Sequence, residues 1–336
     1  MEERAAAGAL VSSPRVLVVR FSAIGDCVMA AFAATAIREK HPDAHITWAC
    51  ENRCEPVLDR ELLVNQVLSF PRERWKKDRW SLSSWREQLV TYSRLRQHSF
   101  DFGLDLQGHS KTALCLRLAN PKRRVAANAT DALAQRLTPP VARRPKGTHM
   151  VVWAIDTLNR LGEFPFPRRP IMPIPIGVLP PEPLPQAYVA LSVSAGQARN
   201  VVPAATWRSV ATDLVASGIR VVLLGGPEAR IEPIPGVIDL VGKTTLVQTI
   251  AILRGARVHV GGDTGTGHIA AAYGRPTVSV FGFADPEEFK PYSDLGLVLK
   301  EGDTTDSVAP ALVTEATLHQ WRLAEWIHND ERPHLG

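Results

Sequence analysis

The sequence predicts an α/β protein built from two facing Rossmann-like domains, with the active site in the cleft between them. Short apolar strands alternate with helical segments in both halves of the 336-residue chain, and several strands end at a glycine just before a helix. Both patterns are typical of parallel sheets with crossover helices, which bind ligands where the strands end. A proline-rich segment at residues 164–187 excludes a helix and predicts a stiff linker. We therefore expect an N-terminal domain at residues 14–163 and a C-terminal domain at residues 188–328.

Composition restricts the class of protein. Hydrophobic residues make up 45% of the chain and charged residues 22%, as in ordinary globular proteins. No apolar run reaches the 18 or so residues that would span a bilayer. The net charge of +5 suits an anionic substrate, and no nucleic-acid-binding signature is present. The four cysteines show no metal-binding or disulfide spacing, which favours a reducing cytosol.

The N-terminal half begins with a predicted βαβ unit. Its first strand, Arg15–Arg20, leads through Gly25 and Asp26 into a helix that we expect from Cys27. Asp at this position is often only the N-cap of the helix. It also lies at the carboxyl end of a first parallel strand, where open α/β sheets bind ligands. Both interpretations stay open on local sequence alone.

A second strand of the N-terminal half, Phe100–Leu106, ends just before Gln107 and Lys111. If its strands are parallel, both side chains will lie in the same crevice as Asp26. Between these strands, residues 71–85 mix five basic residues with three tryptophans. This mixture suits a phosphorylated glycolipid or a membrane headgroup layer, and equally a solvated loop with its tryptophans tucked underneath.

The C-terminal half contains the most informative stretch. A strand at Val258–Val260 ends at Gly261-Gly262, and a helix is expected over His268–Tyr273. The loop between them carries Asp263, Thr264 and Gly265. A glycine-rich loop before a helix N-terminus is suited to a phosphate, and His268 could add a hydrogen bond. The alternative is that Asp263 or Thr264 merely caps the helix.

Four segments, taken together, resemble glycosyltransferase family nine, the bacterial lipopolysaccharide heptosyltransferases, which have the GT-B fold. They are VLVVRFSAIGD from residue 16, DLQGHSK from residue 105, GGPEAR from residue 225 and GGDTGTGHIAAAYGRPTVSVFG from residue 261. The segments occur in the family's order, and the resemblance extends from about residue 15 to residue 325.

The resemblance implies roles for individual residues. Asp26 matches the family's general base, and Glu228 matches the acid that binds the ribose of the donor. The remaining donor-binding residues implied are Asp263, Thr264, Gly265 and His268 in the diphosphate loop, with Ser194 and Arg199 in the loop after the first strand of the second domain. The acceptor-binding residues expected are Arg74 and Lys77 in a basic loop, with Gln107 and Lys111.

Two departures from the family pattern concern substrate choice. Family members usually carry a Lys before a Trp-Pro pair, and here that position holds Asn200, so Arg199 would have to reach the donor phosphates. The family's Ala-Arg-Glu-Pro-like acceptor segment has no clear match in Arg123–Arg144.

The function implied is an inverting, metal-independent transfer of heptose from ADP-heptose to a lipid A-linked lipopolysaccharide core acceptor. No cofactor is expected, and no Asp-x-Asp metal motif is present in either presumed site. The partners implied are a nucleotide sugar and a lipid-linked oligosaccharide, with no nucleic acid. We expect a cytoplasmic protein with at most peripheral contact with the inner membrane. The alternatives are a family-nine-like transferase with another donor or acceptor, and a nucleotide-binding protein whose catalysis has lapsed.

Overall fold

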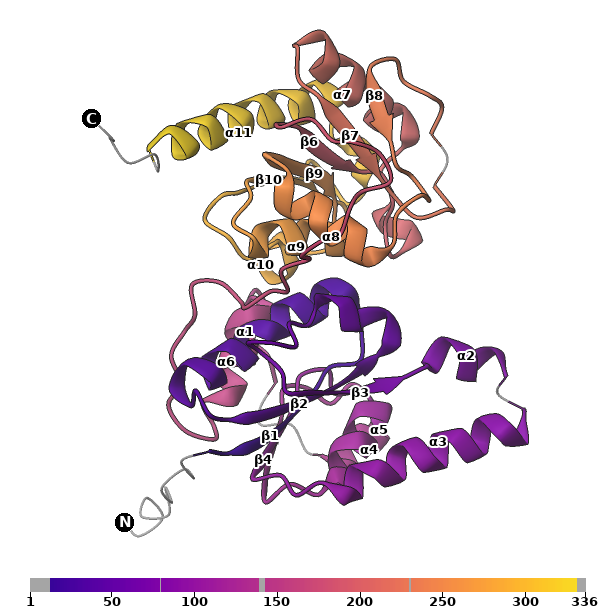
Figure 1. Ribbon diagram of the computed structural model, residues 1–336, viewed down its shortest axis with the longest axis vertical. Helices are drawn as coiled ribbons and strands as arrows, with labels where there is room; N and C mark the ends of the chain where they lie inside the picture. Colours follow the sequence, from indigo (N-terminus) through magenta and orange to yellow (C-terminus); the bar gives the residue numbers. More distant parts are fainter. Residues whose placement is uncertain (1–12, 79, 139–142, 230, 331–336) are drawn as a thin grey trace. The chain divides into compact units, whose positions relative to one another are not determined.

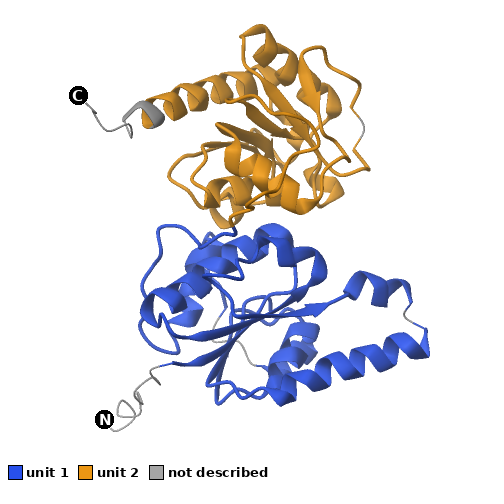
Figure 2. Cartoon of the chain, viewed as in Figure 1, with its two compact units in different colours: residues 1–173 blue, residues 174–336 orange. Residues whose placement is uncertain are grey.

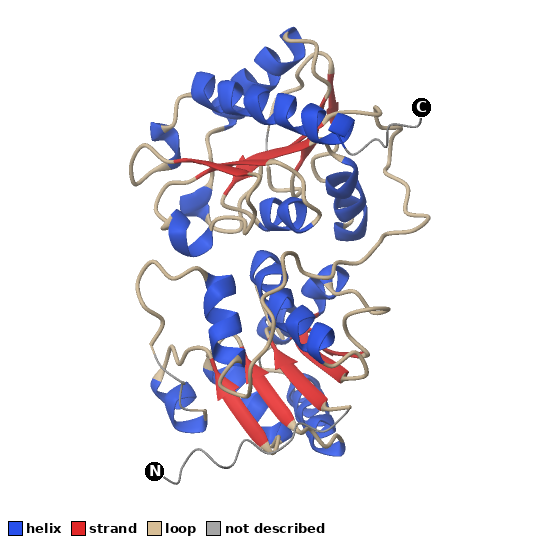
Figure 3. Ribbon diagram, turned by 90° about the vertical axis from the view of Figure 1, so that its left-hand side faces the viewer, coloured by secondary structure: helices blue, strands red, loops and turns tan. Residues whose placement is uncertain are grey.

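The computed structural model describes residues 13–78, 80–138, 143–229 and 231–330. The chain divides into two compact units, residues 1–173 and residues 174–336 (Figure 2). The boundary falls inside the proline-rich segment 164–187, in which no helix or strand forms. Each unit is an α/β layer structure with helices on both faces of one sheet (Figure 3).

Unit 1 contains a five-stranded parallel sheet in the order β3-β2-β1-β4-β5 (Figure 1). Its strands are β1 (Arg15–Val19), β2 (His45–Glu51), β3 (Gln66–Phe70), β4 (Phe102–Asp105) and β5 (Arg123–Ala126). Its helices are α1 (Ile24–Lys40), α2 (Arg72–Lys77), α3 (Leu82–Arg94), α4 (Ser110–Ala119), α5 (Ala132–Leu137) and α6 (Met150–Leu158), with 3-10 turns at Asn52–Val57 and Leu95–Gln97.

Unit 2 contains a six-stranded parallel sheet in the order β11-β10-β9-β6-β7-β8. Its strands are β6 (Val189–Ser192), β7 (Val221–Leu224), β8 (Val237–Asp239), β9 (Val258–Gly262), β10 (Thr277–Val280) and β11 (Gly296–Leu299). Its helices are α7 (Ala204–Ala216), α8 (Leu246–Gly255), α9 (Gly265–Ala272), α10 (Pro286–Phe289) and α11 (Pro310–Asp330), with 3-10 turns at Ala198–Asn200 and Thr305–Ser307.

The central strands are buried on both faces, which explains their continuous apolar sequences. Residues 16–19 of β1, all of β6 and all of β9 are buried, as expected for parallel strands covered by helices. Helix α1 is rich in alanine, and it is buried almost continuously from Cys27 to Ile37. Small side chains let it pack closely against α6.

Both sheets have one position where the strand order reverses direction. In unit 1 this switch point lies between β1 and β4, and in unit 2 it lies between β6 and β9. The loops that leave adjacent strands there diverge to opposite faces of the sheet, which opens a crevice beyond the strand ends. The residues that follow these four strands are therefore the first candidates for a functional site.

Three expectations were wrong: the end of β9, the start of α9 and the loop at residues 71–85. Helix α9 begins at Gly265, three residues before His268, and β9 continues through Gly261-Gly262 instead of ending there. Helix α6 is capped by His149, whose side chain accepts the Val151 N–H. The basic segment at residues 71–85 contains α2 and the start of α3.

The cysteines Cys27, Cys50, Cys54 and Cys115 are all buried free thiols. Within the described residues, no helix is both long and apolar enough to cross a membrane.

Candidate active site

Asp26 lies in the first turn of α1, directly beyond the end of β1. It is not the N-cap, which is Ala23; instead its Oδ2 accepts the Ala23 N–H at 2.8 Å. The same oxygen lies 2.6 Å from Nη2 of Arg20, a buried side chain that also donates to the Leu106 carbonyl. The Asp26 side chain remains 28% exposed, so this fixed carboxylate is within reach of a ligand.

Gln107 joins the loop after β4 to the loop after β1. Its Oε1 accepts the Phe21 N–H at 2.9 Å. The turn that carries Gln107 is held by Asp105, whose Oδ1 accepts the N–H groups of Gln107 and Gly108. Burial raises the pKa of Asp105 to about 6, against the lowering effect of these hydrogen bonds and of Arg20. The loops that carry Asp26 and Gln107 thus leave the neighbouring strands β1 and β4, whereas Lys111 pairs with Glu51 at the end of β2.

A buried carboxylate at the end of β2 gathers three cations beside this loop. Glu51 lies 3.1 Å from Arg53 Nε, 3.4 Å from Lys111 Nζ and 3.5 Å from Arg72 Nε. Arg72 and Lys111 each lie 5.8 Å from the centre of the Phe21 ring. Burial lowers the pKa of Lys111, and the charge of Arg72 lowers it further. Glu73 also lies 3.6 Å from Arg53 Nη1. Two carboxylates therefore face three cations, and the cluster keeps an excess of one positive charge for an anion.

Arg72 and Lys111 border a pocket of about 620 Å³ in unit 1. It combines cationic side chains with an apolar and aromatic wall. The lining residues are Arg72, Trp75, Lys76, Trp85, Gln88, Tyr92, Ser110, Lys111, Leu114 and Leu133. An amphipathic anion, such as a phosphorylated or acidic glycolipid, is the kind of ligand that this lining suits.

The two basic residues expected from the sequence, Arg74 and Lys77, do not line this pocket. Arg74 pairs with Glu87 of α3 instead. Helical spacing explains the difference, because Arg72 and Lys76 share one face of α2, whereas positions 74 and 77 lie on the other.

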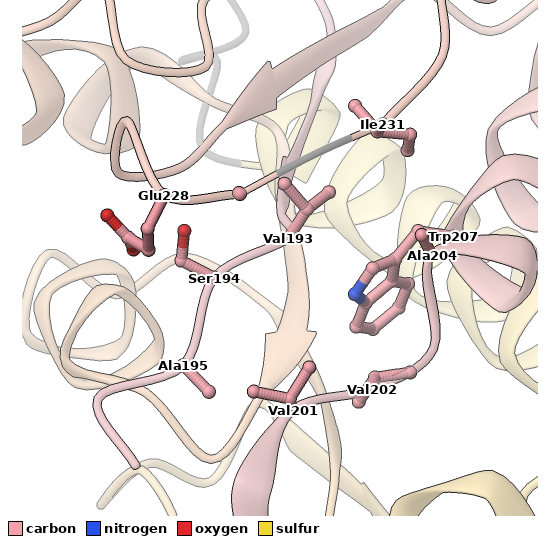
Figure 4. A pocket seen from close by; sticks show the side chains of 10 residues that line it. Val193, Ser194, Ala195, Val201, Val202, Ala204, Trp207, Glu228 and Ile231 are labelled. Atoms are coloured by element: carbon pink, nitrogen blue, oxygen red, sulfur yellow. The ribbon is translucent and has the colours of Figure 1, made fainter. Parts of the chain in front are cut away.

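In unit 2, a pocket of about 200 Å³ opens beyond the end of β6. Ser194 and Glu228 lie side by side at one end of it, and Trp207 forms the wall across from them (Figure 4). Ser194 Oγ accepts the Gly226 N–H at 2.7 Å, which ties the loop after β6 to the loop after β7. The lining is otherwise apolar, from Val193, Ala195, Val201, Val202, Ala204, Ala229 and Ile231.

The first turn of α9 lies beyond the end of β9, next to this pocket. Gly265 is the first residue of the helix and Thr264 is its N-cap by position, with no side-chain capping bond. His268 is buried in the same turn. The helix N-terminus directs backbone N–H groups and a partial positive charge outward, and both favour a phosphate.

Asn200 occupies the position where a Lys is usual in the resembling family. It is buried, and its Nδ2 donates to Asp263 Oδ2 at 2.8 Å. Arg199 is exposed; its Nε donates to Gln197, and its guanidinium lies 4.6 Å from the Phe283 ring centre.

A buried histidine that the sequence did not single out supports this turn. His259 Nε2 lies 3.0 Å from Ser192 Oγ and 3.1 Å from Thr266 Oγ1, and Thr266 Oγ1 lies 2.7 Å from Thr264 Oγ1. Burial lowers the pKa of His259 to about 3, and the charge of His268 adds to the effect. His259 is therefore neutral at physiological pH and joins strands β6 and β9 to the start of α9.

Sequence reasoning also missed Arg20, Glu51 and Arg72. Arg20 and Glu51 end or follow strands, as Asp26 and Asp263 do, so their positions gave a usable signal. Among the described residues, no three His, Cys, Asp or Glu side chains gather as a metal site.

Comparisons with known proteins agree with this geometry. The family model described as glycosyltransferase family 9 (heptosyltransferase) matches residues 90–308. The chain is 27% identical to lipopolysaccharide heptosyltransferase 1 of Pseudomonas aeruginosa over 81% of its own length and 79% of the relative's.

Two solved structures from Escherichia coli have a similar fold. Heptosyltransferase WaaC with ADP matches with a TM-score of 0.77 and 23% identity, over 91% of this chain and 99% of that one. ADP-heptose lps heptosyltransferase II matches with a TM-score of 0.72 and 21% identity, over 93% and 99%. Both are glycosyltransferases of the GT-B type, whose paired α/β domains correspond to the two units. Because the family model covers well over half of the sequence, the chain belongs to glycosyltransferase family 9 and is a glycosyltransferase.

Proposed function

We propose that this protein transfers heptose from ADP-heptose to a lipid A-linked lipopolysaccharide core acceptor, with inversion and without a metal ion. The observation that carries the proposal is the placement of Asp26 at the β1 switch point, where Arg20 and the Ala23 N–H fix its carboxylate. The names of the relatives support the donor and the acceptor class, since they are lipopolysaccharide and ADP-heptose heptosyltransferases.

In this proposal the acceptor hydroxyl attacks the anomeric carbon of the donor while the bond from that carbon to the diphosphate oxygen breaks. Asp26 takes the hydroxyl proton, and ADP leaves. A single displacement inverts the configuration at the anomeric carbon. Deprotonation by a positioned carboxylate typically accelerates such a step by about 10²–10⁴-fold.

We assign ADP to unit 2. The apolar pocket would hold the base, with Ser194 and Glu228 at the ribose hydroxyls. The diphosphate would meet the N-terminus of α9 at Thr264 and Gly265, with His268 and Arg199 adding hydrogen bonds or charge. Asp263 would shape this turn through Asn200. These donors would stabilise the charge that develops on the leaving diphosphate, so the reaction would not need a metal ion.

We assign the anionic groups of the acceptor to the pocket of about 620 Å³ in unit 1. Arg72, Lys76 and Lys111 supply the charge there, and Gln107 holds the neighbouring loop. In place of direct contact, Arg74 would hold α2 against α3 through Glu87, and Lys77 would contribute only a long-range charge.

The test is calorimetric titration with ADP, UDP and GDP, together with transfer assays with and without a chelator. We expect ADP to bind best, and Asp26→Asn to keep its affinity while kcat falls about 10²–10⁴-fold. Asp43→Asn, at an exposed carboxylate in the turn that follows α1, is the matched control and should keep the wild-type rate.

Each part of the proposal has its own contradicting outcome. Preference for UDP or GDP would rule out ADP-heptose as the donor, and loss of activity with the chelator would rule out metal independence. ADP binding without any turnover would favour the lapsed-enzyme alternative, for which Asn200 in place of the usual Lys is the supporting observation.

A further inference from the structure

Helix α3 of unit 1 carries an apolar face that points to solvent. Leu82, Trp85 and Leu89 are 87%, 56% and 70% exposed. Their spacing of three and four residues places them on one face of the helix. The inward face carries Ser84, which is 5% exposed, and Tyr92, whose ring centre lies 5.2 Å from that of Phe70. Most of the large apolar side chains of α3 thus lie on its solvent side.

The exposed surface extends beyond α3. Trp80 precedes the helix, Val90 flanks its apolar face, and Leu133 of α5 borders the same pocket as Trp85. We call this set the α3 face; its members are Trp80, Leu82, Trp85, Leu89, Val90 and Leu133. Figure 1 shows α3 at the margin of unit 1, beyond α4 and α5. Exposed apolar side chains that gather on one helix face and beside one pocket are typical of an interaction site.

The charges around the α3 face identify its partner. Arg86 lies within the apolar stripe and is exposed, and Lys76 and Lys77 of α2 are exposed nearby in the chain. Residues 72–94 contain seven Arg or Lys against three Asp or Glu. Of these acids, Glu87 already pairs with Arg74 and accepts the Trp75 indole N–H at 3.0 Å. Apolar and tryptophan side chains interleaved with cations complement an anionic bilayer surface.

We propose that the α3 face docks unit 1 onto an anionic lipid bilayer, with α3 lying in the plane of the interface. Leu82, Trp85 and Leu89 would enter the boundary between headgroups and acyl chains, while Arg86 and Lys77 meet lipid phosphates. This inference rests on the proposed function, because a lipid-linked acceptor is held in a bilayer. It adds that the acceptor reaches Arg72 and Lys111 from the membrane side, since Trp85 belongs both to the α3 face and to the lining of that pocket.

The experiment is co-sedimentation of the full-length protein with phosphatidylglycerol–phosphatidylethanolamine vesicles and with pure phosphatidylcholine vesicles. The variant is Leu82→Ser/Leu89→Ser, whose positions do not line the acceptor pocket. We expect its affinity for the anionic vesicles to fall at least about tenfold, since two leucines lose their apolar burial. Leu62→Ser, at a leucine of unit 1 that is 62% exposed and lies outside the α3 face, is the matched control and should bind as the wild type does.

A second variant tests the charge independently of the apolar residues. Arg86→Glu should weaken binding to the anionic vesicles and leave the weaker binding to phosphatidylcholine unchanged. Circular dichroism should show that each variant keeps the wild-type helix content, because only exposed side chains are replaced.

Three outcomes would overturn the proposal: no wild-type binding to anionic vesicles, equal binding by the double variant, or a wild-type dimer that the double variant dissociates. A transfer assay with a deacylated, water-soluble acceptor tests the proposed function without a membrane. The double variant should glycosylate this acceptor at the wild-type rate. If the wild type fails to use it, the proposed function fails while the vesicle result still decides the docking.

Discussion

At the scale of single residues, the donor loop depends on a neutral histidine beneath it. His259 is fully buried, and its Nδ1 has no hydrogen-bond partner among the described residues. Its Nε2 lies between the hydroxyls of Ser192 and Thr266. A charged imidazole there would face His268 without water around it, which explains the direction of the pKa shift. His259 thus positions Thr264 and Thr266 without titrating near neutral pH.

This shift predicts acid sensitivity of folding. The pKa of His259 is about 3 in the folded protein, against about 6.5 in the unfolded chain. Between about pH 3 and pH 6.5, His259 is protonated in the unfolded chain but not in the folded protein. Its contribution to the free energy of unfolding is therefore fully present above pH 6.5 and falls as the pH is lowered to about 3. The loss is about 1.4 kcal/mol per pH unit, or about 2 kcal/mol at pH 5.

Urea unfolding at pH 7.5 and pH 5 measures this contribution. His259→Gln can keep a hydrogen bond to Ser192 or Thr266 but cannot titrate, so its stability should decline less between the two pH values, by about 2 kcal/mol. His319→Gln, an exposed histidine of the same unit, should decline as the wild type does. Equal declines for wild type and His259→Gln would show that this histidine does not account for the acid sensitivity.

At the scale of elements, the turn from β4 into α4 requires a glycine. Gly108 has a φ of +75°, and a Cβ there would lie 2.3 Å from the Asn128 carbonyl oxygen. Its N–H also donates to Asp105. A side chain at position 108 would therefore push the turn away from the backbone at Asn128. Gln107, which accepts the Phe21 N–H, would shift with the turn.

We expect Gly108→Ala to lower both stability and transfer activity. Gly147→Ala is the matched control, because Gly147 has a φ of +77° but no atom within 4 Å of the added Cβ. The control should lose about 1 kcal/mol from the backbone conformation alone, and Gly108→Ala a further 1–3 kcal/mol or so from the clash. Chemical denaturation and kcat of both variants measure this, and equal losses would show that the clash relaxes freely.

Most of the strands and helices could be predicted from the sequence, and the exceptions have physical reasons. Alternating apolar strands and helices predicted the parallel sheets. In the structure Val19 pairs with Asp105, so the loops that carry Asp26 and Gln107 follow neighbouring strands. The edge strands β3 and β11 were missed because they are half-exposed and lack a continuous apolar run. The start of α9 was misplaced because its glycines resemble a loop.

Packing accounts for the remaining site residues. Gly267 lies within α9, where an added Cβ would lie 3.3 Å from Pro291, a tight contact; tertiary contacts can override local propensity. Whether Arg72 or Arg74 lines the pocket depends on which face of α2 points toward it. A basic stretch does not specify that face unless the first residue of the helix is known. His259 lies in an apolar strand sequence that gives no sign of its hydroxyl partners.

At the scale of the whole molecule, each unit has the means to fold by itself. The core of unit 2 is formed by side chains of its own strands and of α7 and α11, and unit 1 has a separate core around Leu17, Phe21 and Phe70. The segment between the two sheets, residues 164–187, forms no helix or strand. Cores of this size, joined by a connector without secondary structure, are typical of independent domains.

We therefore predict that a fragment of residues 174–336 folds and binds ADP, because every residue that we assign to the donor lies in it. Its Kd for ADP should lie within about threefold of the full-length value, a difference of less than 1 kcal/mol. The fragment of residues 1–173 should fold without binding ADP and is the control. Thermal unfolding should first show a cooperative transition in each fragment. Calorimetric titration with ADP then measures the Kd of both fragments. A folded C-terminal fragment that binds ADP more than about tenfold more weakly would mean that unit 1 contacts the nucleotide, and part of the donor site would then have to be reassigned to that unit.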